Sequence, residues 1–88
     1  MQPYLEVNYR SGRLFAAYLH LRAKPRGAST RTRLFEPGLV VDLNDAGDAL
    51  GVEITAPRQV TVTSLNRALR AVGAPTVRRA DIAPLNAA

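Results

Sequence analysis

The sequence of 88 residues contains no cysteine, one histidine and one lysine. Without cysteine the chain can form neither a disulfide framework nor a thiolate zinc site, and it cannot use a cysteine nucleophile. A chain this short also buries a smaller fraction of its surface than a larger domain does. Its fold must therefore be held together by the hydrophobic core alone.

Long apolar runs are also absent. No run approaches the roughly 18 residues that span a bilayer, and the first residues, MQPYLEVNYR, have neither the basic start nor the apolar centre of a signal peptide. Hydrophobic residues make up 47% of the chain and charged residues 22%, as in folded globular proteins. We therefore expect a single cytoplasmic domain over residues 1–88, with no membrane partner.

The net charge of +5 is distributed in three blocks. Residues 1–35 carry seven basic side chains and one acidic one, residues 36–56 carry five acidic ones, and residues 57–88 carry five basic ones and one acidic one, so the blocks contribute +6, −5 and +4. A basic surface is typical of nucleic-acid binding. Eleven of the twelve basic residues are arginine, however, and codon composition explains this bias equally well. We favour a solvated basic surface that the acidic block partly neutralises.

The first 56 residues predict strands and turns. Residues 4–9 alternate between two faces, and residues 14–23 do the same, which is the period of half-buried strands. Residues 24–29 are polar and rich in helix and strand breakers, whereas residues 30–36 favour a further strand. The predicted core side of the second strand consists of Phe15, Ala17, Leu19 and Leu21.

The clearest register is that of a predicted hairpin over residues 39–54. A four-residue turn at residues 45–48 places the apolar pairs Leu39 and Ile54, Val41 and Val52, and Leu43 and Leu50 on one face. Asp42, Gly51 and Glu53 then share the outer face.

Pro37 and Gly38 fit the centre of a type II turn, because proline fixes one backbone angle and glycine accepts the positive φ that follows. Continuing the register through this turn sets Arg33 opposite Asp42 as a cross-strand charge pair. It also leaves Phe35 on the outer face.

After Pro57 the period changes to that of an amphipathic helix, with Leu65, Ala68, Leu69 and Val72 on one side. Thr61, Thr63 or Ser64 can cap its start, and Gly73 followed by Pro75 ends it. A second, short helix is expected around residues 79–83, before Pro84. The predicted fold is thus α+β: an antiparallel β-meander of about five strands in residues 1–56, followed in residues 57–88 by one C-terminal amphipathic helix, packed on one face of the sheet, and a tail.

His20 is the natural candidate for a general base, and it shares the predicted outer face with Asp42 and Glu53. In a meander His20 and Asp42 lie two strands apart, or about 10 Å in the pairing direction. Catalytic proton transfer needs about 3 Å or one bridging water. We therefore expect a solvated or interface histidine and a protein that is not an enzyme.

Residues 42–47 followed by Glu53 copy part of a calcium-binding loop, with an acid first, asparagine third and glycine sixth. Ala46 and Leu50 cannot supply the ligands at the fifth and ninth positions, so a hairpin turn is the better explanation, and no metal or cofactor is predicted. Gly51 leaves two alternatives open: close approach of a neighbour or ligand, or a simple bend in the strand.

The segment EPGLVVDLNDAGDALGVEI, residues 36–54, resembles domain-of-unknown-function family 2283, a family of short prokaryotic proteins. The residues that carry the resemblance are Pro37, Gly38, Val41, Asp42, Asp45, Gly47, Gly51, Glu53 and Ile54. The tail VTVTSLNRALRAVGAP resembles an extension found in some members, whereas Arg10 stands where many members have an acid. The resemblance implies no established activity. Some members are encoded beside small toxin-like ribonucleases, which implies an antitoxin-like binding role.

We expect a protein-interaction module that forms a homodimer or binds a small protein partner through the outer sheet face or through the edge strands, the first and the last of the meander. The alternative is RNA binding through a basic, aromatic-bearing sheet face, on which Arg22, Arg31 and Arg33 would surround Tyr18 or Phe35. The candidate binding residues are Tyr18, His20, Arg22, Arg31, Arg33, Phe35, Asp42, Gly51 and Glu53.

Overall fold

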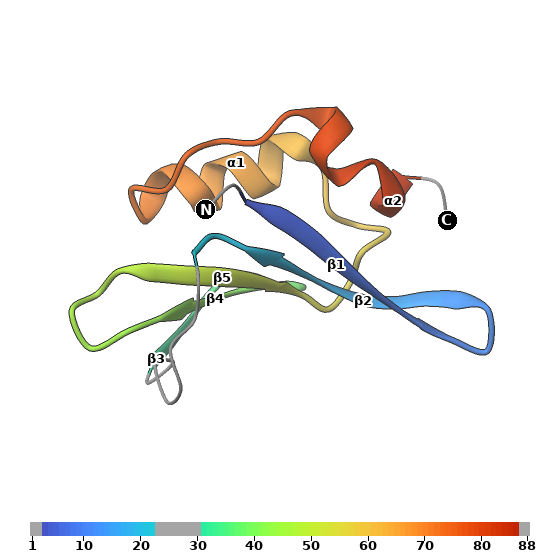
Figure 1. The fold of residues 1–88 in the computed structure, drawn as a ribbon, viewed down its shortest axis with the longest axis horizontal. Coiled ribbons are helices and arrows are strands. Elements are labelled where there is room, and N and C mark those ends of the chain that lie inside the picture. The colour runs from blue at the N-terminus through green and yellow to red at the C-terminus, as the bar shows by residue number, and fades with distance from the viewer. Residues whose placement is uncertain (1–2, 23–30, 87–88) are drawn as a thin grey trace.

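The computed structural model of the chain describes residues 3–22 and 31–86. A five-stranded antiparallel sheet forms one layer, and the helices lie together on one of its faces (Figure 1), so the α+β class is confirmed. No helix in the described part of the chain is long and apolar enough to cross a membrane. The elements in chain order are β1 (Tyr4–Arg10), β2 (Arg13–His20), β3 (Arg31–Glu36), β4 (Leu39–Leu43), β5 (Ala49–Ile54), α1 (Val62–Ala71), the 3-10 helix η1 (Arg79–Ile82) and α2 (Ala83–Asn86).

The strand order is β1-β2-β5-β4-β3, which differs from a simple meander. Strands β3, β4 and β5 are consecutive neighbours, but β2 pairs with β5. The edges are therefore β1 and β3, and the prediction that the last strand is an edge is wrong. The physical reason is burial: every residue of β5 except Glu53 is buried, which suits the centre of the sheet.

The hairpin of β4 and β5 largely follows the predicted register. Leu39 lies opposite Ile54 and Val41 opposite Val52, but a shift after Asp42 sets Leu43 opposite Ala49. The predicted pairing of Leu43 with Leu50 is therefore wrong, because Leu50 is the extra residue of a β-bulge.

A turn joins these strands as predicted, but it consists of residues 44–48 instead of the predicted four residues 45–48. The Asn44 amide donates to the Asp48 carbonyl over 3.0 Å, and the Asp48 amide donates to Asn44 Oδ1 over 2.9 Å. Gly47 has a φ of 87°, which favours glycine. The residues that resemble a calcium loop thus make a hairpin turn.

A second bulge changes the pairing of β3. Arg33 lies opposite Val41, and Thr32 lies opposite Asp42, because the register shifts between Leu34 and Glu36. The predicted pair of Arg33 with Asp42 is therefore wrong. Phe35 is the extra residue; it packs against the hydrophobic core on the helix side instead of lying on the outer face.

A third bulge lies in the hairpin of β1 and β2. Tyr9 pairs with Leu14 and Asn8 with Ala16, so Phe15 has no partner on β1. Leu14 is buried in its place, whereas Phe15 is 52% exposed, which corrects its predicted place in the core. The core positions Ala17 and Leu19 are buried as expected.

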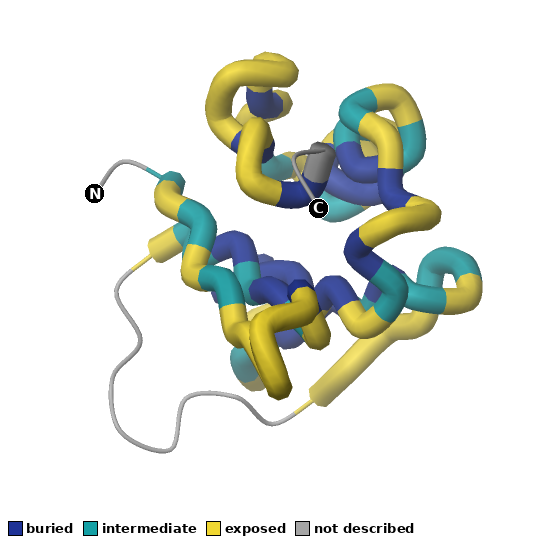
Figure 2. Tube along the Cα trace, turned by 90° about the vertical axis from the view of Figure 1, so that its right-hand side faces the viewer, coloured by how far each residue is buried: buried dark blue, intermediate teal, exposed yellow. Residues whose placement is uncertain are grey.

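Helix α1 docks on the sheet through Leu65, Ala68 and Leu69, all of which are buried. The Thr61 hydroxyl accepts a hydrogen bond from the Ser64 amide, and the Ser64 hydroxyl accepts one from the Thr61 amide, a reciprocal capping arrangement that selects Thr61 among the predicted caps. The hydrophobic core lies between the helices and the sheet, and Figure 2 shows the buried residues gathered there.

The C-terminal segment extends farther than predicted. Helices η1 and α2 together run to Asn86, past Pro84, because proline is tolerated in the first turn of a helix, where its missing amide proton is not needed. Ile82 and Leu85 are buried against the core. Asn66 of α1 holds this segment in place, since its side chain donates to and accepts from the backbone of Val77 at 2.9 and 2.8 Å.

Candidate functional site

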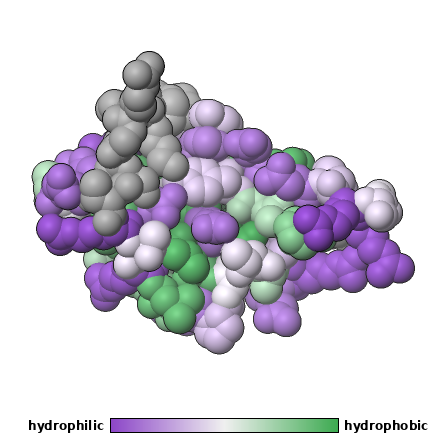
Figure 3. All heavy atoms as spheres, turned by 90° about the horizontal axis from the view of Figure 1, so that it is seen from below, coloured by the Kyte–Doolittle hydropathy of each residue, from purple (hydrophilic) through white to green (hydrophobic). Residues whose placement is uncertain are grey.

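The outer face of the sheet, opposite the helices, brings together the predicted residues of β2, β4 and β5. His20, Gly51 and Asp42 form one cross-strand row, and Tyr18, Glu53 and Val40 form the next. Figure 3 views the molecule from this side, where hydrophilic residues surround a smaller hydrophobic area. The β2–β5 pairing creates both rows, because it places β5 directly between β2 and β4.

Gly51 is the residue over which the side chains of this face meet. A Cβ atom at this position would collide with the ring and hydroxyl group of Tyr18, so the ring lies directly over the Gly51 backbone. The Tyr18 hydroxyl thereby reaches across β5 and donates a hydrogen bond of 2.8 Å to Asp42 Oδ2. Gly51 therefore allows the close approach of a neighbour, the Tyr18 side chain, and is not a simple bend in the strand.

His20 lies beside this pair. Its ring stacks on Tyr4, with centroids 4.4 Å apart, and meets the Tyr18 ring edge-on at 4.7 Å. Its Nε2 lies 2.7 Å from Glu6 Oε1. Tyr4 and Glu6 were not among the sequence candidates, although their alternation in β1 places them on the same face as Tyr18 and His20.

The Tyr18 hydroxyl is held in its protonated form. Burial is the largest cause that raises the pKa of Tyr18 well above its usual value, followed by the hydrogen bond to Asp42 and by the negative charges of Asp42 and Glu53. The hydroxyl therefore acts as a hydrogen-bond donor at neutral pH and not as a base. This arrangement suits a structural polar network better than proton transfer.

The three predicted basic residues do not join this face. Arg22 Nη1 lies 3.6 Å from Asp48 Oδ2, and Arg31 Nη2 donates to the Asp45 carbonyl over 3.4 Å, so both lie near the β4–β5 turn. Arg33 lies opposite Val41 on the helix side, 4.5 Å from the centroid of the Phe35 ring. The structure thus brings Arg33 to Phe35, with Arg31 on the same side of β3, whereas Tyr18 lies on the opposite face of the sheet.

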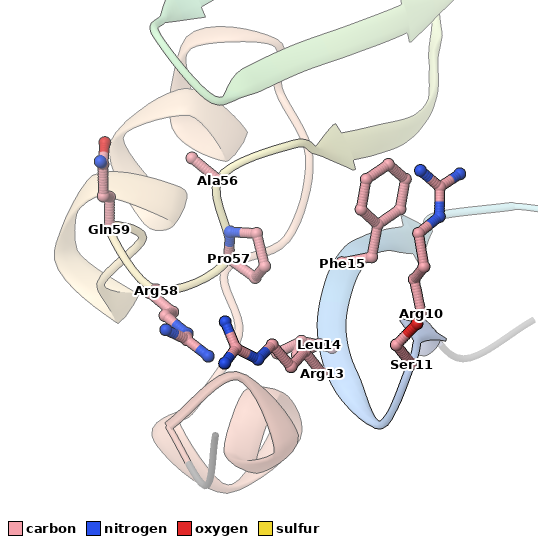
Figure 4. Close-up of a pocket in the computed structure, with 9 residues that line it drawn as sticks. All are labelled: Arg10, Ser11, Arg13, Leu14, Phe15, Ala56, Pro57, Arg58 and Gln59. Atoms are coloured by element: carbon pink, nitrogen blue, oxygen red, sulfur yellow. The ribbon is translucent and has the colours of Figure 1, made fainter.

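A second candidate site lies where the β1–β2 turn meets the connection between β5 and α1. We call it the arginine pocket, and it has a volume of about 800 Å³. Figure 4 shows Arg13 and Arg58 pointing toward one another, whereas Arg10 lies beside Phe15. The Arg10 guanidinium is 4.2 Å from the centroid of that ring. The lining residues are Arg10, Ser11, Arg13, Leu14, Phe15, Ala56, Pro57, Arg58 and Gln59.

The sequence did not predict the arginine pocket. Its halves are far apart in the chain, and the pairing of Ala17 with Ile54 is what carries residues 56–58 alongside residues 13–15. The only available signal was the Ser11-Gly12 turn flanked by two arginines. That signal indicates a tight hairpin and does not by itself indicate a ligand.

Comparison of the chain with protein-family models, with curated proteins and with solved structures found no match. The likeness of residues 36–54 to an uncharacterised family therefore stays a prediction. What these surfaces do must be inferred from their own geometry, charge and exposure.

Proposed function

We propose that this protein is a non-catalytic cytoplasmic interaction module that forms a homodimer through the free edge of β3. The observation that carries this proposal is the exposure of that edge. Residues 31–34 of β3 are all exposed, and Leu34 is 66% exposed. In Figure 2 the strand that follows the long grey trace is exposed along most of its length.

An edge strand presents backbone donors and acceptors that another strand can pair with. Natural edges are protected by lysine, by proline or by short length, and β3 has six residues with neither lysine nor proline. The other edge, β1, starts directly after Pro3 and packs against η1. Strand addition is therefore favoured at β3.

The sequence of β3 suits pairing with a second copy of itself. In an antiparallel pair centred on Leu34, the two Leu34 side chains face one another and bury their exposed surface. Arg33 then faces the partner's Phe35. Each chain already has a cation–π contact between its own Arg33 and Phe35, and the dimer would add a second contact of this kind between the chains. A register centred on Arg33 would instead oppose two arginines, a repulsive arrangement that disfavours it.

The outer face of the sheet is a weaker candidate for this interface. Its polar groups already contact one another, as in the hydrogen bond from Tyr18 to Asp42 and the contact of His20 with Glu6. Breaking such contacts to bind a partner costs free energy. The alternative of RNA binding through this face also loses support, since Arg31 and Arg33 lie on the helix side.

The test is the mass in solution of the unaltered protein and of Leu34→Asp, measured by light scattering at about 100 μM, a concentration at which micromolar association is complete. We expect twice the mass of the 9.5 kDa chain for the unaltered protein and a folded monomer for the variant. Tyr9→Asp on β1 is the matched control, because Tyr9 is similarly exposed at 60%. A monomeric unaltered protein, or equal disruption by both variants, would refute dimerisation through β3.

A further inference from the structure

We propose that the arginine pocket binds the phosphate group of a nucleotide, either free or within a single nucleic-acid strand. This inference does not depend on dimerisation through β3, because the pocket involves β1 and β2 and the proposed interface lies at the opposite edge of the sheet.

Three arginines line the pocket, and within the described part of the chain none of them is paired with a carboxylate. Among the residues that the structure describes, the side-chain ion pairs involve Glu6, Asp48 and Asp81, and none of these carboxylates lies within 4.0 Å of Arg10, Arg13 or Arg58. The guanidinium groups of Arg13 and Arg58 face one another (Figure 4), and like charges in this position repel, which costs the folded protein free energy. A bound anion removes that repulsion and gains attraction to each guanidinium group.

The turn between β1 and β2 sets the backbones of Arg10 and Arg13 side by side. Ser11, with a φ of 52°, and Gly12, with a φ of 77°, make a tight two-residue turn of left-handed conformation. Arg10 and Arg13 are therefore direct cross-strand partners, an arrangement that disfavours like charges. Their side chains diverge, so that Arg13 points toward Arg58 and Arg10 lies over Phe15 (Figure 4).

The facing guanidinium groups of Arg13 and Arg58 suit a phosphate. A planar guanidinium group donates two parallel hydrogen bonds to phosphate oxygens, and two guanidinium groups from different segments can bind one phosphate from two sides. Ser11 and Gln59 also line the pocket, but Ser11 lies beside Arg10 and the Gln59 amide points away from Arg13 and Arg58 (Figure 4). The two facing guanidinium groups are therefore what matches this end of the pocket to a phosphate group.

The other end of the pocket suits a flat ring. Phe15 is half exposed because the bulge turns it out of the core, and Leu14, Ala56 and Pro57 add apolar lining. Nucleic-acid bases stack on exposed aromatic rings and on guanidinium planes, and both are present where Arg10 lies over Phe15. The volume of about 800 Å³ exceeds what an isolated phosphate needs and lies in the range of small-molecule sites.

Calorimetric titration at low salt tests this proposal with pyrophosphate, adenosine diphosphate and a short single-stranded oligonucleotide as probes. We expect binding of at least one nucleotide probe, and Arg58→Ala should weaken it about tenfold, as the loss of a hydrogen bond to a charged group requires. Phe15→Ala should weaken binding of the nucleotide probes and leave the affinity for pyrophosphate unchanged. Tighter binding of adenosine diphosphate would identify the ligand as a free nucleotide, and tighter binding of the oligonucleotide would identify it as a nucleic-acid strand.

Arg67→Ala is the matched control, because Arg67 is exposed on α1 and its loss changes the net charge equally. For the oligonucleotide, Arg58→Ala should also reduce the slope of log affinity against log salt by about 0.7 per lost phosphate contact, whereas Arg67→Ala should not. Absence of binding of every probe at millimolar concentration would overturn the proposal. Equal loss from both arginine variants would do so too, since it would mean a general charge effect. Leu34→Asp should bind the probes normally.

Discussion

The hydroxyl group of Tyr18 on β2 donates a hydrogen bond of 2.8 Å to Asp42 on β4, although β5 lies between these strands. The contact is possible because Gly51 of β5 has no side chain to separate them. Three strands are thus linked by one side chain on the outer face. His20 and Glu6 continue these contacts to β1.

Gly51→Ala should destabilise the protein by about 1 to 3 kcal/mol, because the new methyl group collides with the Tyr18 ring and pushes the hydroxyl away from Asp42. Urea denaturation gives the free energy of unfolding. In a Tyr18→Ala background the same change should be neutral or stabilising, since alanine suits a strand better than glycine. An equal loss in both backgrounds would show that Tyr18 is not the cause.

The free energy of unfolding should fall as the pH rises above about 10, the ordinary pKa of tyrosine. The pKa of Tyr18 is raised in the folded protein, so the folded state keeps a proton that the unfolded state releases first. The stabilisation is complete below pH 10 and is lost progressively above it. Tyr18→Phe should make the alkaline part of the pH profile flatter, and an unchanged slope would contradict the assignment.

The faces of the sheet could be predicted only where the strands are regular. Alternation correctly placed Ala17 and Leu19 inside and Asp42 and Gly51 outside. Each wrong assignment lies at a bulge, at Phe15, Phe35 or Leu50, because one extra residue reverses the alternation. Counting residues in steps of two cannot detect where such a residue is inserted.

The strand order required information that a local pattern lacks. The pairing of β2 with β5 joins residues more than 30 positions apart, for example Ala17 and Ile54. The loop expected from the sequence, residues 24–29, has six residues and is only slightly longer than a usual hairpin loop of about two to five, so it gave no clear sign that the strands beside it do not pair. The arginine pocket depends on this pairing, so it could not be predicted before the order was known.

Leu69→Ala should destabilise the protein by about 2 to 5 kcal/mol, because Leu69 is fully buried between α1 and the sheet and its truncation leaves a cavity. Arg67→Ala, on the exposed side of the same helix, should change the free energy of unfolding by less than about 0.5 kcal/mol. Chemical denaturation of the two variants provides the comparison. Similar losses would mean that the helix docks through a different side.

Thr61→Ala should lower the free energy of unfolding by about 0.5 to 2 kcal/mol, the usual cost of losing an N-cap side chain. The Thr61 hydroxyl accepts a hydrogen bond of 3.0 Å from the Ser64 amide, which has no acceptor within the helix. Thr63→Ala is the control: Thr63 is exposed in the first turn, and alanine has the higher helix propensity, so this change should be neutral or stabilising. Thermal melts of the two variants measure the difference. If Thr63→Ala were the more damaging change, the helix would start at a different residue, and the reciprocal bonds between Thr61 and Ser64 would not be what caps it.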